Sequence, residues 1–401
     1  MQAGRAIKWQ TPLAWKNLTH DWRRLAVAIA GVGFAVLLMF TQVGFQNALF
    51  DSQVKLIDDL QGDILLVSKA KFALASEKRF PITRLTQAES LSGVAGAYPL
   101  YSELTLSVLK NLAEGKRSKG FPIRSIGFNL DDPVLRAPAV AAQKSMLRLP
   151  HTALIDVRSK TDKFDFPLSD AAQLAQQPAE LANQRIQLVG VFEMGADFAH
   201  DGNLVMSDEN FARYFPMRKQ FGDPLEVVDL GIVHVKPGFD VAEVRQLVDD
   251  VLPDDVWVYT REQYRSREVQ FWDESTPIGI VFNAGKILGF VVGLVICYQV
   301  IYTDVADHLP EFATLRAMGY STAYFLRLVV VEGILLSLIG FVPGLLLSWG
   351  LYWVLADTTG LQLKMTVDSA LLVLVLTIVM CIASGLLALR KLLAADPASL
   401  F

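Results

Sequence analysis

The sequence is poor in cysteine and in charged residues. Its 401 residues include two cysteines, Cys297 and Cys381, and both lie in long apolar runs. This excludes a disulfide framework and a cysteine-based metal site in the polar part of the chain. Only 19% of the residues are charged, compared with about 25% in ordinary soluble domains, and 52% are hydrophobic. The composition therefore indicates a membrane protein.

Patterns of catalytic chemistry are also lacking. The five histidines are scattered along the chain, and we find no His-Glu-x-x-His, Gly-x-Ser-x-Gly or phosphate-binding loop. The net charge of −4 excludes a basic surface for nucleic acid. We find no internal repeat and no low-complexity tract. We therefore expect no catalytic residue, no metal site and no cofactor in this chain, and no ATP hydrolysis by this chain alone.

Four apolar runs are long enough to cross a membrane. The first covers 25–45, and its 21 residues would extend about 32 Å as a helix, against a hydrocarbon core of ~30 Å. A cleaved signal peptide would have a shorter apolar core, so we predict an uncleaved span. The other predicted spans are 278–302, 324–356 and 370–389. Pro277 suits the first turn of the second span, and Pro343 can bend the third.

Lysine and arginine in the short segments predict the orientation. They are frequent in the tail 1–24 and occur as Arg390 and Lys391 in the C-terminal tail. Loop 303–323 carries Arg316, with Arg327 just inside the third span, and loop 357–369 has only Lys364. Both termini and loop 303–323 are therefore expected in the cytoplasm, with 46–277 and 357–369 outside. Trp15, Leu18 and Trp22 recur at helical spacing, which favours either an amphipathic interfacial helix in the tail or a simple positive anchor.

The external segment 46–277 predicts an α+β domain, in two lobes with crossings near 129–138 and 221–224. Its ends at 46–60 and 260–275 predict two helical stalks, the second with a Glu262–Arg265 pair. Alternation and apolar periodicity predict the elements inside the domain. The expected strands are 63–68, 104–109, 123–128, 152–156, 185–192, 227–235 and 256–259, and the expected helices are 85–93, 169–176, 207–215 and 240–252.

Charged and small residues within the spans raise two further questions. Lys286 and Glu332 each lie about a third of the way into a span, from opposite sides, and we favour a packing role over ion coupling. A glycine stripe permits close helix approach, either inside one subunit or between two copies. Its members are Gly285, Gly289 and Gly293 in the second span and Gly340 and Gly344 in the third.

Loop 303–323 between the second and third spans predicts a short helix. Pro310 fits its first turn and Gly319 fits the position after its end. An apolar face that includes Phe312 could enter the groove of a partner protein, or could merely lie on the lipid surface.

This loop carries a resemblance to a known family. The run from Glu311 to Ser321 resembles the coupling segment of MacB/FtsX-type permeases, the type VII ABC transporters. Residues 33–50, 276–279, 307–311, 341–344 and 396–401 resemble the DevC branch of that family. The resemblance covers essentially the whole chain. It implies a four-span α-helical membrane protein with a large α+β periplasmic domain between the first and second spans.

The resemblance also implies partners and a mechanism. It implies a homodimer in the bacterial inner membrane, bound to two ATPase subunits that hold the ATP and Mg. Docking on them is implied for Glu311, Phe312, Leu315, Arg316, Met318 and Gly319. The DevC branch further implies a periplasmic membrane fusion adaptor, a TolC-like outer-membrane protein and export of a lipid, glycolipid or other hydrophobic substrate. The alternatives are an FtsX-like transducer that regulates a cell-wall hydrolase and a lipoprotein-extraction permease.

Overall fold

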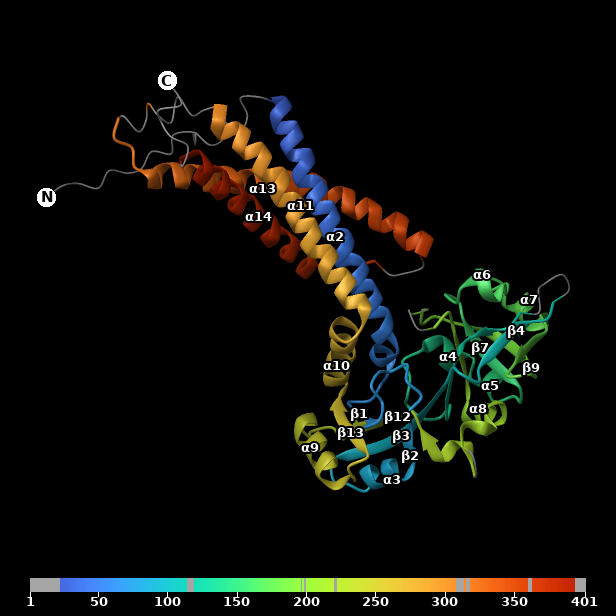
Figure 1. The fold of residues 1–401 in the computed structure, drawn as a ribbon. Helices are drawn as coiled ribbons and strands as arrows, with labels where there is room; N and C mark the ends of the chain where they lie inside the picture. Colours follow the sequence, from blue (N-terminus) through green and yellow to red (C-terminus); the bar gives the residue numbers. More distant parts are fainter. Residues whose placement is uncertain are drawn as a thin grey trace. The chain divides into compact units, whose positions relative to one another are not determined.

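The computed structural model describes residues 22–113, 119–195, 197, 200–219, 222–307, 314, 318–359 and 363–393. The chain forms two compact units (Figure 1). One unit, here called the membrane unit, comprises Met1–Ala48 and Pro277–Phe401, and the other, the external domain, comprises Leu49–Thr276. Most of the tail 1–24, and with it the predicted interfacial helix, lies outside the described residues.

Four long helices carry the apolar runs. They are α2 (Trp22–Asp59), α11 (Pro277–Asp307), α13 (Thr322–Thr359) and α14 (Val367–Leu393). Each is long and apolar enough to cross a membrane. The α/β domain is inserted between the first and second of these helices. The fold class predicted from the sequence is therefore confirmed.

The core of the membrane unit is built around α2. Val32, Val36, Met39 and Phe40 of this helix are buried within an apolar cluster that includes residues of α11, α13 and α14. The hydroxyl of Tyr352 on α13 donates a hydrogen bond to the carbonyl of Phe40. Polar backbone groups and side chains in such a core need internal partners, because lipid supplies none.

The external domain is organised around a sheet of 11 strands in the order β13-β1-β12-β3-β6-β10-β7-β9-β8-β4-β5. Neighbours pair antiparallel, except for the parallel pairs β6–β10 and β7–β9. A second sheet pairs β2 with β11. The strands are β1 (Ile64–Ser68), β2 (Phe80–Pro81), β3 (Val94–Glu103), β4 (Val108–Asn111), β5 (Phe121–Pro122), β6 (Arg124–Phe128), β7 (Thr152–Asp156), β8 (Ala179–Leu181), β9 (Gln184–Phe192), β10 (Asn203–Ser207), β11 (Val227–Val228), β12 (Leu230–Val235) and β13 (Val256–Thr260).

Helices cover the sheet. They are α3 (Thr83–Glu89), α4 (Pro138–Ala142), α5 (Lys144–Leu147), α6 (Thr161–Phe164), α7 (Ala171–Gln176), α8 (Asp208–Tyr214), α9 (Val241–Val251) and α10 (Arg261–Glu274), with the 3-10 turns η1 (Pro216–Arg218) and η2 (Pro224–Glu226). Ile64 and Leu66 of β1 belong to one apolar cluster, and Leu65 and Val67 to another. Successive side chains of a strand point to opposite faces, so both faces of β1 are buried.

The longest strand was missed by the sequence analysis. Residues 94–100 of β3 pair with β12, and residues 101–103 pair with β6, so β3 is shared by two groups of strands. The expected crossing at 129–138 is wrong, because these residues join β6 to α4. The expected strand at 104–109 is also misplaced, since 104–107 separate β3 from β4. The 221–224 turn does fall on the return connection between β10 and β12.

Candidate functional site

The predicted coupling segment is described only in part. Thr314 is helical, and Met318 and Gly319 form a turn before α13. Gly319 has φ +96°, a left-handed conformation that suits the residue after a helix, and Met318 is exposed. Four of the residues expected to dock on an ATPase, Glu311, Phe312, Leu315 and Arg316, lie outside the described residues.

The glycine stripe of α11 is packed inside a single chain. A Cβ on Gly285 would lie 2.5 Å from the side-chain oxygen of Gln42, and one on Gly293 would lie 2.6 Å from the Cβ of Ala35. A Cβ on Gly289 would lie 3.4 Å from Met39. Gly285 and Gly289 thus face α2, whereas Gly293 lies between Ala35 of α2 and Met380 of α14.

Helix α13 crosses α2 at its own glycines. A Cβ on Gly344 would lie 2.6 Å from Val36 and 2.8 Å from the carbonyl oxygen of Gly33. A Cβ on Gly340 would lie 2.5 Å from Val32. Real Cβ atoms essentially never approach so closely. The five predicted packing glycines thus bring α11 and α13 against the same helix, α2.

Charged groups of the membrane unit are paired at one end of the bundle. Arg24 near the start of α2 forms an ion pair with Asp307 at the end of α11. Glu332 is buried and Lys286 is half-buried, and both have interaction partners.

An arginine fork joins the two helices that enter the external domain. On α10, the Arg265 guanidinium donates to Asp58 through Nε and to Asp51 through Nη2, each at 3.1 Å. Both carboxylates lie on α2, seven residues apart and therefore on one face. The predicted Glu262–Arg265 pair is replaced by this contact. Arg261 adds a hydrogen bond of 2.9 Å to the carbonyl of Leu60.

The same helix α10 is held to the domain from its other side. The Glu268 carboxylate accepts a hydrogen bond from the Leu74 backbone N–H at 2.9 Å and another from the Trp272 indole at 3.0 Å. Burial raises the pKa of Glu268. The helix begins with a capping box, in which Thr260 and Gln263 exchange side-chain and backbone hydrogen bonds. α10 is therefore fixed at its start, along its length and against α2.

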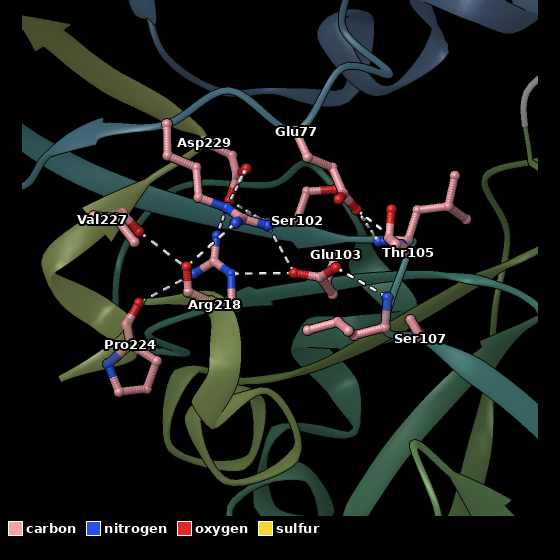
Figure 2. Close-up of polar contacts among 12 residues, drawn as sticks. Glu77, Ser102, Glu103, Thr105, Ser107, Arg218, Pro224, Val227 and Asp229 are labelled. Carbon is pink, nitrogen blue, oxygen red and sulfur yellow. Dashed lines mark hydrogen bonds and ion pairs between the residues drawn. The ribbon is translucent and has the colours of Figure 1, made fainter. Parts of the chain in front are cut away.

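A buried ion network lies where β3 passes between its two partner strands (Figure 2). The side chain of Arg218, from η1, is fully buried and pairs with Asp229 and with Glu103, the latter at 3.6 Å. Arg79 pairs with Glu103 at 2.7 Å and with Asp229 at 3.3 Å. Two guanidinium groups thus face two carboxylates.

Backbone groups and aromatic rings complete this network. Arg218 also donates to the carbonyls of Pro224 and Val227, at 3.3 and 3.4 Å (Figure 2). Its guanidinium lies 4.8 Å from the centre of the Phe211 ring. Burial and the nearby Glu77 carboxylate raise the pKa of Glu103 to about 7. Burial lowers the pKa of Arg218. No sequence pattern marked this network, because its members come from distant segments.

A second buried polar group lies in the other half of the sheet. Arg124 on β6 donates to Asn203 at 2.8 Å and to Asp197 at 3.0 Å. His200 contacts Asp197 at 2.6 Å, and burial together with the nearby Arg124 guanidinium lowers the pKa of the imidazole. These contacts join Asp197 and His200, which lie between β9 and β10, to Arg124 on β6. Among the residues that the structure describes, no three potential metal ligands converge.

Comparison with known proteins finds a family that matches the C-terminal part of the chain and two solved structures similar to part of it. Residues 285–397 match the family "FtsX-like permease C-terminal". The chain is also similar to the periplasmic region of MacB from Actinobacillus actinomycetemcomitans, at 11% identity and a TM-score of 0.33, over 52% of this chain and 92% of that one. A further similar structure is the extracellular domain of the noncanonic ABC-type transporter YknZ from Gram-positive bacteria, at 11% identity and a TM-score of 0.31, over 49% and 99% of the two chains.

Proposed function

We propose that this chain is a MacB/FtsX-type permease of the type VII ABC transporters and the transmembrane subunit of an export complex. A homodimer of the chain would lie in the bacterial inner membrane with its termini in the cytoplasm. ATP and Mg would be bound by two separate ATPase subunits. The chain itself would supply no catalytic residue.

The observation that supports this proposal most is the FtsX-like match over 285–397, which includes the predicted coupling segment. Glu311, Phe312, Leu315, Arg316, Met318 and Gly319 would dock on the ATPase. The exposed Met318 and the turn at Gly319 suit such a role. Motion of this segment would be passed to α11 and α13, which pack against α2.

Helices α2 and α10 would carry that motion to the external domain. α2 supplies residues to both units without interruption, from Trp22 to Asp59. In the external domain, Arg265 fastens α10 to α2 through Asp51 and Asp58. The substrate would be a lipid, glycolipid or other hydrophobic molecule, moved outside the membrane through a membrane fusion adaptor and a TolC-like protein, as in the DevC branch.

Charge reversal tests the role of the stalk. We expect Arg265→Glu to leave ATP hydrolysis by the complex in place but to abolish export, because three acidic groups would then face one another. Reversing all three charges, with Asp51→Arg and Asp58→Arg added, should restore export. Lys236→Glu makes the same charge change at an exposed site and serves as the control. Normal export by the Arg265→Glu variant would refute the proposed route.

Charge placed in the coupling segment tests the partner. Leu315→Asp or Arg316→Asp should release the ATPase from the chain, whereas Lys364→Asp, in the loop predicted on the other side of the membrane, should not. Mass spectrometry of crosslinked complexes reads the result. Recovery of an ATPase and an adaptor supports export, while an ATPase with a cell-wall hydrolase supports the transducer alternative. An ATPase with lipoproteins and no adaptor supports lipoprotein extraction, and no ATPase at all would refute the proposal.

A further inference from the structure

A cavity opens beside the last turns of α13. Its volume is ≈ 500 Å³, and its lining includes Trp349, Gly350, Tyr352 and Trp353 of α13 and Leu363 and Met365 of the segment before α14. Among the residues that the structure describes, no charged side chain belongs to this lining. Pockets of this size with apolar and aromatic walls are typical of small-molecule sites. Neither the predicted ATPase docking nor the stalk uses this cavity.

One wall of the cavity is rigid. Tyr352 is only 3% exposed, and its hydroxyl is committed to the carbonyl of Phe40 on α2. The ring therefore cannot turn away without losing a buried hydrogen bond. The polar atom of Tyr352 is occupied, so the ring presents carbon to the cavity.

The floor and sides of the cavity remain open. A Cβ on Gly350 would meet no atom within 4 Å, so space lies next to the backbone there. Trp349 and Trp353 are one helical turn apart and are 68% and 80% exposed. The two indoles are large apolar surfaces that the described residues of this chain leave uncovered.

The depth of the cavity points to the class of its ligand. Trp349 and Trp353 lie in the last two turns of the predicted span 324–356, at the end of a helix long enough to cross a membrane. Tryptophan is enriched where hydrocarbon meets the lipid headgroups, with the ring in the apolar layer and the N–H toward water. A cavity there opens to the acyl chains of one leaflet.

We propose that this cavity is a binding site for an acyl chain of a membrane phospholipid. The acyl chain would lie along α13 beside Gly350, Trp349 and Trp353, and would contact Leu363 and Met365. The lipid headgroup would remain at the level of the indole N–H groups. This inference does not depend on the transport function, because it rests on the cavity alone.

Filling the cavity tests the proposal. Gly350→Leu adds a side chain where no atom is displaced, and leucine favours a helix more than glycine does. Leu346→Phe adds bulk to an exposed position on the same helix outside the cavity lining and is the matched control. The full chain is extracted with its lipids and washed stepwise with detergent, and native mass spectrometry counts the retained phospholipids. We expect one tightly retained phospholipid in the wild type and in Leu346→Phe, and an occupancy about tenfold lower in Gly350→Leu.

A photoreactive phospholipid, with a diazirine in its acyl chain, locates the site. It should label peptides containing 349–353 and 363–365, and excess unlabelled phospholipid should suppress the labelling. Labelling that cannot be saturated and is unchanged in Gly350→Leu would mean ordinary surrounding lipid and would overturn the proposal. Labelling suppressed by free fatty acid but not by phospholipid would overturn the assigned source. Disulfide-linked dimers formed by Trp353→Cys, and not by the wild type, would show that a second copy covers the cavity instead.

Discussion

Removing the guanidinium of Arg218 tests the buried network at β3 directly. Arg218→Ala leaves the carboxylates of Asp229 and Glu103 buried, with only Arg79 to pair with both. Breaking a buried ion pair by deleting one partner costs about 3–5 kcal/mol, because an uncompensated charge remains in the interior. Arg218→Ala also removes two hydrogen bonds to backbone carbonyls and the packing of the guanidinium on two aromatic rings. We therefore expect the free energy of unfolding to fall by an amount within that range.

Hydrogen exchange of the full chain measures this loss locally. The backbone amides of β3 and β12, which pair beside the network, should exchange roughly 10²-fold to a few thousand-fold faster in Arg218→Ala, since every ~1.4 kcal/mol of opening free energy is a factor of ten. Arg185→Ala removes an exposed arginine from β9 and should change the opening free energy of these amides by less than about 1 kcal/mol.

A second substitution separates charge from packing. Asp229→Asn in the Arg218→Ala background removes one of the two buried negative charges, so it should recover part of the lost protection. The reasoning would be refuted if Arg218→Ala changed exchange no more than Arg185→Ala does. It would also be refuted if Asp229→Asn made the double variant less protected than Arg218→Ala alone.

Three further predictions concern single groups. The pKa of Glu103 is raised from 4.5 to about 7, so the folded protein takes up a proton between these values that the unfolded chain does not. The wild type should therefore gain stability relative to Glu103→Gln as the pH falls from about 8 to about 5.5. A difference in melting temperature that stays constant over this pH range would contradict the prediction. Gly344→Ala should reduce the yield of folded protein, because the added Cβ would lie 2.8 Å from a carbonyl oxygen. Gly350→Ala should not reduce the yield, since its Cβ would meet no atom within 4 Å. Equal yields of the two variants in size-exclusion chromatography would argue against the α2–α13 crossing. Thr260→Ala should cost about 1 kcal/mol by removing the capping box of α10, seen as faster exchange of the first amides of that helix and not of α9.

The sequence predicted the membrane part well because its signal is long and uniform. Each apolar run is about as long as a membrane-spanning helix and much longer than the apolar stretch of an ordinary soluble helix, so no other structure fits it. The glycine spacing favoured close helix approach, but only the structure shows which helices lie against each glycine: α2 at all five, and also α14 at Gly293. Periodicity marks a helix face, but it does not say which helix covers that face.

The external domain was predicted less completely, for a different physical reason. Buried strands such as β1, with the sequence ILLVS, are nearly continuous apolar runs and were found. β3 was missed because Gly96 and Pro99 interrupt its pattern, although the structure shows it to be the strand shared by both halves of the sheet. Its burial alternates irregularly because it changes partners midway, which no local pattern records.

The partners of charged side chains could not be predicted from the sequence. Glu262 and Arg265 stand at a spacing that favours a local pair, but Arg265 reaches Asp51 and Asp58, more than 200 residues earlier in the chain. Each of these pairs is partly exposed and worth roughly 0–1 kcal/mol alone, so their contribution to stability is small. A fork that binds two carboxylates at once instead fixes the position of α10 along α2. Losing it should therefore change how motion is passed between the helices far more than it changes the melting temperature, and Arg265→Gln should separate these two effects in parallel export and unfolding measurements.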